Sequence, residues 1–93
     1  MSLPSLEILE NNHTFPGPYV FKVIGFADAN FTGRVVASVR DELGIDIDPP
    51  YSLRSTSSGK HVAITLEPEC SSPQKVLAIY SRLMGMDGLV MLL

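Results

Sequence analysis

The sequence predicts an α+β domain of βαββαβ order, in which a four-stranded antiparallel sheet carries two helices on one face. The order of the apolar segments supports this prediction. An extended run over 18–26 precedes a helical run over 31–43, and a hairpin over 51–67 follows. A second helical run over 73–84 then leads into an extended apolar tail over 89–93. The expected order of the strands across the sheet is 4-1-3-2.

The first strand is expected in Tyr19-Val20-Phe21-Lys22-Val23-Ile24, which is rich in β-branched and aromatic residues. Successive side chains of a strand point to opposite faces, so Tyr19, Phe21 and Val23 share one face. The other face carries Lys22, and burial of an unpaired lysine is costly. We therefore expect the face with Lys22 to point away from the helices.

The first helix is predicted over 31–43 from apolar residues at helical spacing, with Asp28 or Asn30 as its cap. Gly33 weakens a helix by roughly 1 kcal/mol relative to alanine, so we expect another backbone to approach it closely. Two prolines keep the linker over 46–50 from being helical.

Two alternating strands predict a hairpin over 51–66, with Gly59 supplying the positive φ that its turn needs. The second helix is predicted over 73–84, with Ser71 or Ser72 as its cap. The expected core collects the inward-facing residues of these elements: Phe21, Val23, Val35, Val36, Val39, Val62, Ile64, Leu66, Val76, Tyr80 and Leu83.

Length and composition predict one packed domain. The 93 residues suffice for a single core, and 45% apolar against 18% charged residues is typical of a globular chain. Residues 15–93 are expected to form this domain, after a flexible or loosely docked segment over 1–14. The start Met1-Ser2-Leu3-Pro4 is interpreted as partly a cloning scar, and it lacks the basic region and apolar stretch of a secretion signal.

Charge and cysteine content limit the expected partners. Seven basic and ten acidic residues give a formal charge of −3, and the basic residues are scattered along the chain. Nucleic-acid binders gather Lys and Arg on one face, so nucleic acid is not expected as a partner. The single Cys70 excludes an intrachain disulfide, and no apolar run is long enough to cross a membrane. We therefore expect a cytoplasmic protein without a membrane partner.

No residue constellation predicts a catalytic, metal or cofactor site. Ser58-Gly59-Lys60 lacks the upstream glycine of a phosphate loop and precedes a strand, so it is interpreted as a hairpin turn. His13, His61 and Cys70 lie on three different elements, without the short spacing of metal ligands. The closely spaced carboxylates lie at linkers and strand ends, where solvation explains them: Asp46, Asp48, Glu67 and Glu69.

Three stretches carry a resemblance to a known family. They are Phe15-Pro-Gly-Pro-Tyr-Val-Phe-Lys-Val-Ile-Gly25, Arg54-Ser-Thr-Ser-Ser-Gly-Lys-His-Val-Ala-Ile-Thr-Leu66, and Ile79-Tyr-Ser-Arg-Leu83 with Gly88-Leu-Val-Met-Leu-Leu93. Through them the chain resembles the YbeD-like family of small, uncharacterised bacterial proteins. The resemblance implies a ferredoxin-like plait similar to ACT regulatory domains, in which an open sheet face or edge mediates ligand binding or dimerisation. It implies no established activity.

The open sheet face is the expected functional surface. We predict a non-enzymatic regulatory or interaction module that binds a small anionic metabolite or a protein partner there, a homodimer included. If Leu6, Ile8 and Leu9 fold over this face, the segment over 1–14 seals it instead. The expected interaction face consists of Val20, Lys22, Ile24, Arg54, His61, Ala63, Thr65, Val90 and Leu92.

Two other functions fit the same plait. A small acylphosphatase-like hydrolase is the alternative, but the loop over 25–30 lacks the arginine that this chemistry uses to hold phosphate. An RNA-recognition plait needs exposed aromatic residues on the two central strands, and the expected outward residues there do not supply them.

Overall fold

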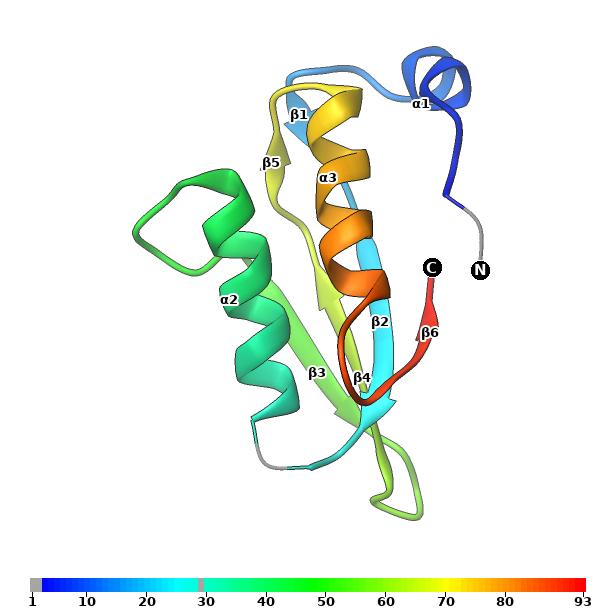
Figure 1. The fold of residues 1–93 in the computed structure, drawn as a ribbon, viewed down its shortest axis with the longest axis vertical. Coiled ribbons are helices and arrows are strands. Elements are labelled where there is room, and N and C mark those ends of the chain that lie inside the picture. Colours follow the sequence, from blue (N-terminus) through cyan, green and yellow to red (C-terminus); the bar gives the residue numbers. More distant parts are fainter. Residues whose placement is uncertain (1–2, 29) are drawn as a thin grey trace.

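The computed structural model describes residues 3–28 and 30–93, which form an α+β fold with three helices and two antiparallel sheets (Figure 1). This confirms the predicted α+β class. Met1 and Ser2, where the scar was expected, lie outside the described residues. In chain order the elements are α1 (Leu6–Asn12), β1 (Gly17–Pro18), β2 (Phe21–Phe26), α2 (Phe31–Leu43), β3 (Tyr51–Ser55), β4 (His61–Leu66), β5 (Glu69–Cys70), α3 (Pro73–Met84) and β6 (Leu89–Leu92).

The larger sheet has four strands in the order β3-β4-β2-β6, and each neighbouring pair is antiparallel. Helices α2 and α3 lie side by side over one face of it (Figure 1). A second, two-stranded sheet pairs Gly17 with Cys70 and Pro18 with Glu69. It ties the segment before β2 to the segment before α3. Strands of two residues are too short to show alternation, so sequence reasoning missed them.

The core lies between the helices and the larger sheet. All eleven residues predicted for it are buried. The structure adds residues that were not on that list: Leu9, Tyr19, Phe31, Cys70, Ile79 and Leu92. Leu9 belongs to α1, which packs against α3, so the amino-terminal helix contributes to the core (Figure 1).

Two expectations about α2 are wrong. Asn30 is its N-cap residue, but its φ is 73° and its side chain makes no capping hydrogen bond. A capping side chain normally projects from extended backbone, which the left-handed conformation of Asn30 does not provide. Gly33 has nothing within 4 Å of the position a Cβ would take, so no other backbone approaches it. In α3, the cap is Ser72, whose Oγ accepts a hydrogen bond from the Lys75 backbone N–H.

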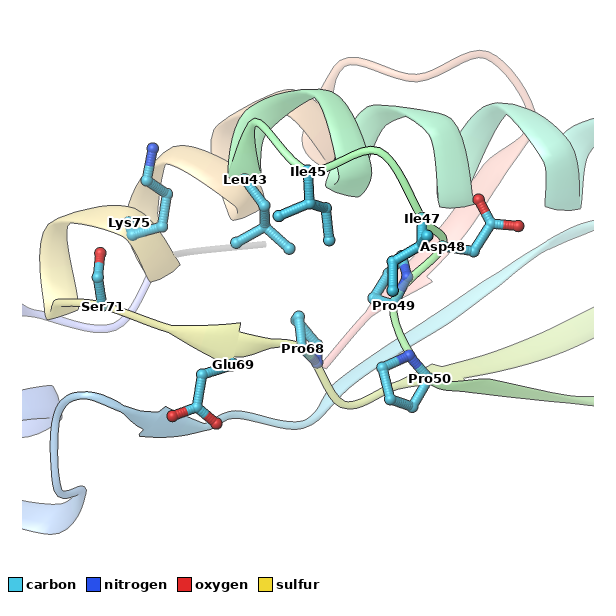
Figure 2. Close-up of a pocket in the computed structure, with 10 residues that line it drawn as sticks. All are labelled: Leu43, Ile45, Ile47, Asp48, Pro49, Pro50, Pro68, Glu69, Ser71 and Lys75. Carbon is cyan, nitrogen blue, oxygen red and sulfur yellow. The ribbon is translucent and has the colours of Figure 1, made fainter.

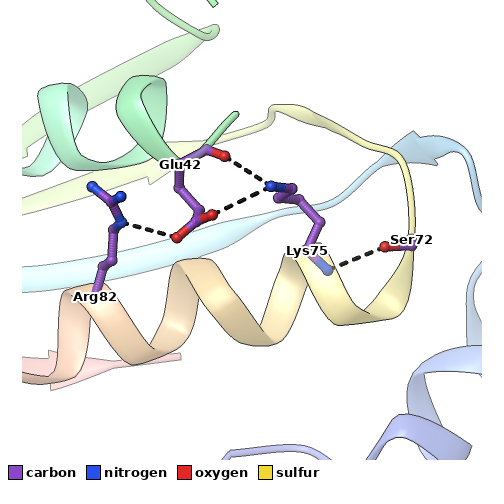
Figure 3. Close-up of polar contacts among 4 residues, drawn as sticks. All are labelled: Glu42, Ser72, Lys75 and Arg82. Carbon is purple, nitrogen blue, oxygen red and sulfur yellow. Dashed lines mark hydrogen bonds and ion pairs between the residues drawn. The ribbon is translucent and has the colours of Figure 1, made fainter. Parts of the chain in front are cut away.

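Glu42 joins α2 to α3 (Figure 3). Its carboxylate accepts from Lys75 Nζ at 3.3 Å and from Arg82 Nε at 2.9 Å, and its backbone carbonyl accepts from Lys75 Nζ at 2.9 Å. The hydrogen bonds from Lys75 and then Arg82 lower the pKa of the Glu42 carboxyl. Both cations are therefore neutralised on the helix side of the molecule.

Candidate functional site

The face of the larger sheet that points away from the helices is formed by alternating residues of its strands. In β2, Phe21 and Val23 are buried on the helix side, and Lys22 points the other way. The strand register aligns these outward residues in rows, because Lys22 lies beside Thr65 and Thr65 beside Ser52. The next row joins Ile24, Ala63 and Arg54. The structure thus brings together on one face the predicted residues Lys22, Ile24, Arg54, Ala63 and Thr65.

A shallow depression of about 400 Å³ lies in this face. Lys22 and Arg54 line it from β2 and β3, and no Asp or Glu side chain lines it. Its other lining residues are small, apolar or hydroxyl-bearing: Ile24, Ser52, Leu53, Ala63, Ile64, Thr65 and Leu93. The arrangement offers two cationic groups and several apolar contacts to a ligand, but no group that could act as an acid or a base near neutral pH.

The cations of the two faces differ in their partners. On the helix side, Arg34, Arg40, Lys75 and Arg82 all form ion pairs, among them Arg40 with Asp48 at 2.7 Å. In the part of the chain that the structure describes, Lys22, Arg54 and Lys60 form none. The open face is therefore locally positive within a chain of formal charge −3.

Sequence reasoning missed an aromatic pair on the same face. Phe26 lies within the extended run expected over 18–26 but outside the alternating strand expected over 19–24. It ends β2 and lies beside His61 of β4, with the ring centroids 5.1 Å apart. The Phe26 side chain is 51% exposed. The assumption that the central strands present no exposed aromatic residue is therefore wrong. If the alternation had been extended two residues past Ile24, it would have placed Phe26 on this face.

The predicted place of Leu92 on the open face is also wrong. Leu92 lies beside the buried Val23 and is itself only 7% exposed, on the helix side. The register of β6 against β2 shifts between Ile24 and Gly25, which leaves Val90 as an extra residue in a β-bulge. A shift of one residue moves every later side chain to the opposite face. Met91 and Leu93 therefore point to the open face in place of Leu92, and Val90 is exposed at the bulge.

The amino-terminal segment does not cover the open face. Its helix α1 packs against α3, with Leu9 buried in the core (Figure 1). Of the open-face residues, Val20 is 44% exposed and Leu93 is 59% exposed. The interpretation in which Leu6, Ile8 and Leu9 seal the sheet is wrong, because this helix docks at the end of the helix layer.

A separate apolar cavity of about 260 Å³ lies between the linker after α2 and the segment around β5 (Figure 2). Its wall is made mainly of aliphatic and proline side chains, and the polar groups stand at the rim. Asp48 and Lys75 at the rim are already bound to Arg40 and Glu42. The lining residues are Leu43, Ile45, Ile47, Asp48, Pro49, Pro50, Pro68, Glu69, Ser71 and Lys75.

Cys70, His61 and His13 belong to three different elements: Cys70 ends β5, His61 begins β4, and His13 is the C-cap residue of α1. Cys70 is fully buried, and burial raises the pKa of its thiol to about 11. His13 packs against Tyr19 with ring centroids 4.8 Å apart, and His61 lies at the start of β4. Over residues 3–28 and 30–93, no three His, Cys, Asp or Glu side chains lie close enough to hold a metal ion.

The loop and turn candidates have structural roles. Gly59 has φ 74° and donates its backbone N–H to the Thr56 carbonyl at 2.9 Å, so the segment with Lys60 is a hairpin turn, as predicted. Near the start of α2, the Arg34 guanidinium donates to the Asp87 carbonyl at 3.0 Å and to Asp28 at 3.4 Å. No helix in the described part of the chain has the length and apolar character of a membrane span.

The comparisons with known proteins agree with one another. Residues 10–93 match the family model described as "Protein of unknown function (DUF493)". A UPF0250 protein of Shewanella sp. (strain ANA-3) is 31% identical over 74 residues, which cover 80% of this chain and 82% of the relative. UPF0250 proteins of Shewanella oneidensis and Shewanella baltica (strain OS155) are 30% and 31% identical over the same shares of the two chains. These matches confirm the resemblance to small bacterial proteins of the YbeD-like family.

Proposed function

The chain belongs to the DUF493 family of proteins of unknown function, and from its own geometry we propose that it is a non-enzymatic regulatory or interaction module. In this proposal the open sheet face binds an anionic ligand, either a small metabolite or an acidic segment of a protein partner. The surface lies on a ferredoxin-like plait with the strand order 4-1-3-2. The succession β2-α2-β3-β4-α3-β6 and the order β3-β4-β2-β6 support that part of the proposal.

The observation that carries the proposal is the placement of Lys22 and Arg54. They line one depression that contains no Asp or Glu side chain, and neither has an ion-pair partner among the described residues. A guanidinium binds carboxylate or phosphate oxygens through two parallel hydrogen bonds, and an ammonium adds a point charge. Apolar contacts with Ile24 and Leu93 favour a ligand that also has a hydrocarbon part.

The surroundings favour binding over catalysis. The depression has no Asp, Glu, Cys or His side chain among its lining residues that could transfer a proton or attack a substrate. A hydrolase of the acylphosphatase type holds phosphate with an arginine beside the loop after the first strand. The arginine nearest that loop is Arg34, and its guanidinium is bound to Asp28 and to the Asp87 carbonyl. The hydrolase alternative therefore receives no support from this loop.

A titration followed by NMR tests the proposal. Glutarate, glycerol 3-phosphate and a hexaglutamate peptide serve as probes, and the backbone amide signals of Lys22, Arg54 and Thr65 are expected to move on binding. Arg54→Gln should weaken binding about tenfold, because a hydrogen bond to a charged group is lost. Arg40→Gln is the matched control, since it changes the net charge equally but lies on the helix side.

Two results would contradict the proposal. Equal weakening by Arg54→Gln and Arg40→Gln would mean that only the total charge of the protein matters. Saturable binding of a single-stranded oligonucleotide, with signals of Phe26 and His61 shifted, would assign the face to nucleic acid through base stacking instead.

A further inference from the structure

A third cavity lies at the opposite end of the sheet from the hairpin turn, where α1, α3 and β6 meet. It is open on one side and has a volume of about 620 Å³, within the range of small-molecule sites in proteins. The amino-terminal segment forms one wall of it, and the end of β6 forms another. The lining residues are Leu3, Pro4, Ser5, Ile8, Tyr19, Tyr80, Leu92 and Leu93.

Two buried tyrosines give this cavity its polar group. Tyr19 is 9% exposed and Tyr80 is 7% exposed, and their hydroxyl oxygens lie 3.2 Å apart. Each hydroxyl has one proton, and one proton suffices for the hydrogen bond between them. The second proton has no acceptor among the described residues. Because the two tyrosines line an open cavity, water or a ligand in the cavity can accept this proton.

We propose that this cavity binds an aliphatic carboxylate, with the hydrocarbon chain against Ile8 and Leu92 and the carboxylate accepting a hydrogen bond from the Tyr19–Tyr80 hydroxyl pair. The site is distinct from the depression of the open face, although Leu93 lines both.

The chemistry of the walls selects this class of ligand. Every lining residue other than Ser5 and the two tyrosines is aliphatic or proline, so a hydrocarbon chain removes apolar surface of both partners from water. Burial, and then the hydrogen bond with Tyr19, raise the pKa of the Tyr80 hydroxyl, which keeps it a donor at all physiological pH values. The cavity has no lining cation, so a long chain must contribute more to affinity here than the carboxylate does.

Isothermal titration of the full chain with decanoate tests the proposal. The chain has no tryptophan, and two of its three tyrosines line the cavity, so tyrosine emission gives a second readout of binding. Saturable binding with a change in tyrosine emission is the expected result. Absence of both signals at millimolar decanoate would overturn the proposal, because water alone would then satisfy the hydroxyl pair.

Paired variants locate the binding site. The double variant Tyr19→Phe with Tyr80→Phe should bind decanoate at least tenfold more weakly, whereas Tyr51→Phe on the exposed strand β3 should bind normally. If the double variant does not fold, Ile8→Glu tests the same site. Ile8 is 56% exposed, so the variant should fold, and the added carboxylate in the cavity wall should repel decanoate and weaken its binding. Its matched control is Ile47→Glu, at a 76% exposed position outside this cavity.

One outcome separates this site from the open face. If Arg54→Gln removes decanoate binding and Ile8→Glu leaves it unchanged, decanoate binds at the open face. The cavity proposal is then wrong and the proposed function is supported. Loss with Ile8→Glu and retention with Arg54→Gln supports the cavity proposal, and the proposed function is then decided by its own probes.

Discussion

Replacing Gly25 by alanine tests the closest contact between β2 and α2. Gly25 lies where β2 pairs with both β4 and the bulged β6. A Cβ built on it overlaps the tip of the fully buried Phe31 ring and lies 2.8 Å from the Gly88 carbonyl oxygen. The ring and the backbone of the segment before β6 therefore occupy the space that any larger residue needs. This explains a glycine in the middle of a central strand.

The expected loss of stability follows from two opposing effects. Overpacking a core costs about 1–3 kcal/mol, and a contact with both a ring and a backbone oxygen belongs at the upper end. Alanine recovers about 0.5–1 kcal/mol, because glycine loses more conformational entropy on folding. The net loss for Gly25→Ala is about 2 kcal/mol. In a domain of this size, each kcal/mol lowers Tm by about 4–8 °C, so Tm should fall by about 8–16 °C.

A double-mutant cycle with Phe31→Leu identifies the cause. Leucine lacks the ring atoms Cζ and Cε2, which are the side-chain atoms nearest the added methyl group. The cost of Gly25→Ala should therefore shrink by about 1 kcal/mol in the Phe31→Leu background, as coupling between contacting residues predicts. Denaturant unfolding of the four proteins measures each free energy. Additive costs, or a Gly25→Ala protein as stable as the parent, would refute the reasoning.

Three further predictions concern the turn, the buried thiol and the interhelical carboxylate. Gly59→Val should lower the free energy of unfolding by roughly 1 kcal/mol or more, because its φ of 74° is strained for valine, while Ser58→Ala should be near neutral; equal costs would contradict the turn. With a pKa of about 11, Cys70 should react with iodoacetamide at pH 8 roughly 100-fold more slowly than a free cysteine, and burial should slow it further; rapid labelling of the folded protein would show that the thiol is accessible. The folded protein lowers the pKa of Glu42. Its carboxylate therefore stabilises the folded state at pH values above the ordinary pKa of 4.5, and this stabilisation is lost as the pH falls through the pKa of the folded state. The Tm difference between the parent and Glu42→Gln should therefore narrow at acid pH, and a constant difference would mean that the carboxylate charge is not what joins the helices.

Much of the fold was predictable because its elements repeat with a clear period. The helices over 31–43 and 73–84 and the hairpin strands begin and end at the predicted residues, since each has a periodic apolar pattern and turn residues at its ends. The segment over 1–14 was less predictable. A helix of seven residues has little intrinsic stability, and it is held by the Ser5 cap and by packing of Leu9 against the rest of the core.

The candidate site was predictable only where one face of a strand is polar. Lys22 and Arg54 show which face of β2 and of β3 points away from the helices. The other residues of that face then follow from the alternation of side chains along each strand. The tail over 89–93 consists of five apolar residues, so its sequence contains no sign of which face is buried. The bulge at Val90 is therefore not visible in the apolar pattern, and Leu92 was assigned to the wrong face.

The separation of paired from unpaired cations makes the electric field of the molecule change sign with distance. Far from the surface an anion meets the net charge of −3, and this repulsion reaches furthest at low ionic strength. Within a Debye length, about 8 Å in physiological salt, the field of Lys22 and Arg54 dominates in front of the open face. Added salt screens the distant repulsion before it weakens the close attraction. The association rate of an anionic partner should therefore first rise and then fall as salt is added, whereas a uniformly charged protein shows a change in one direction only.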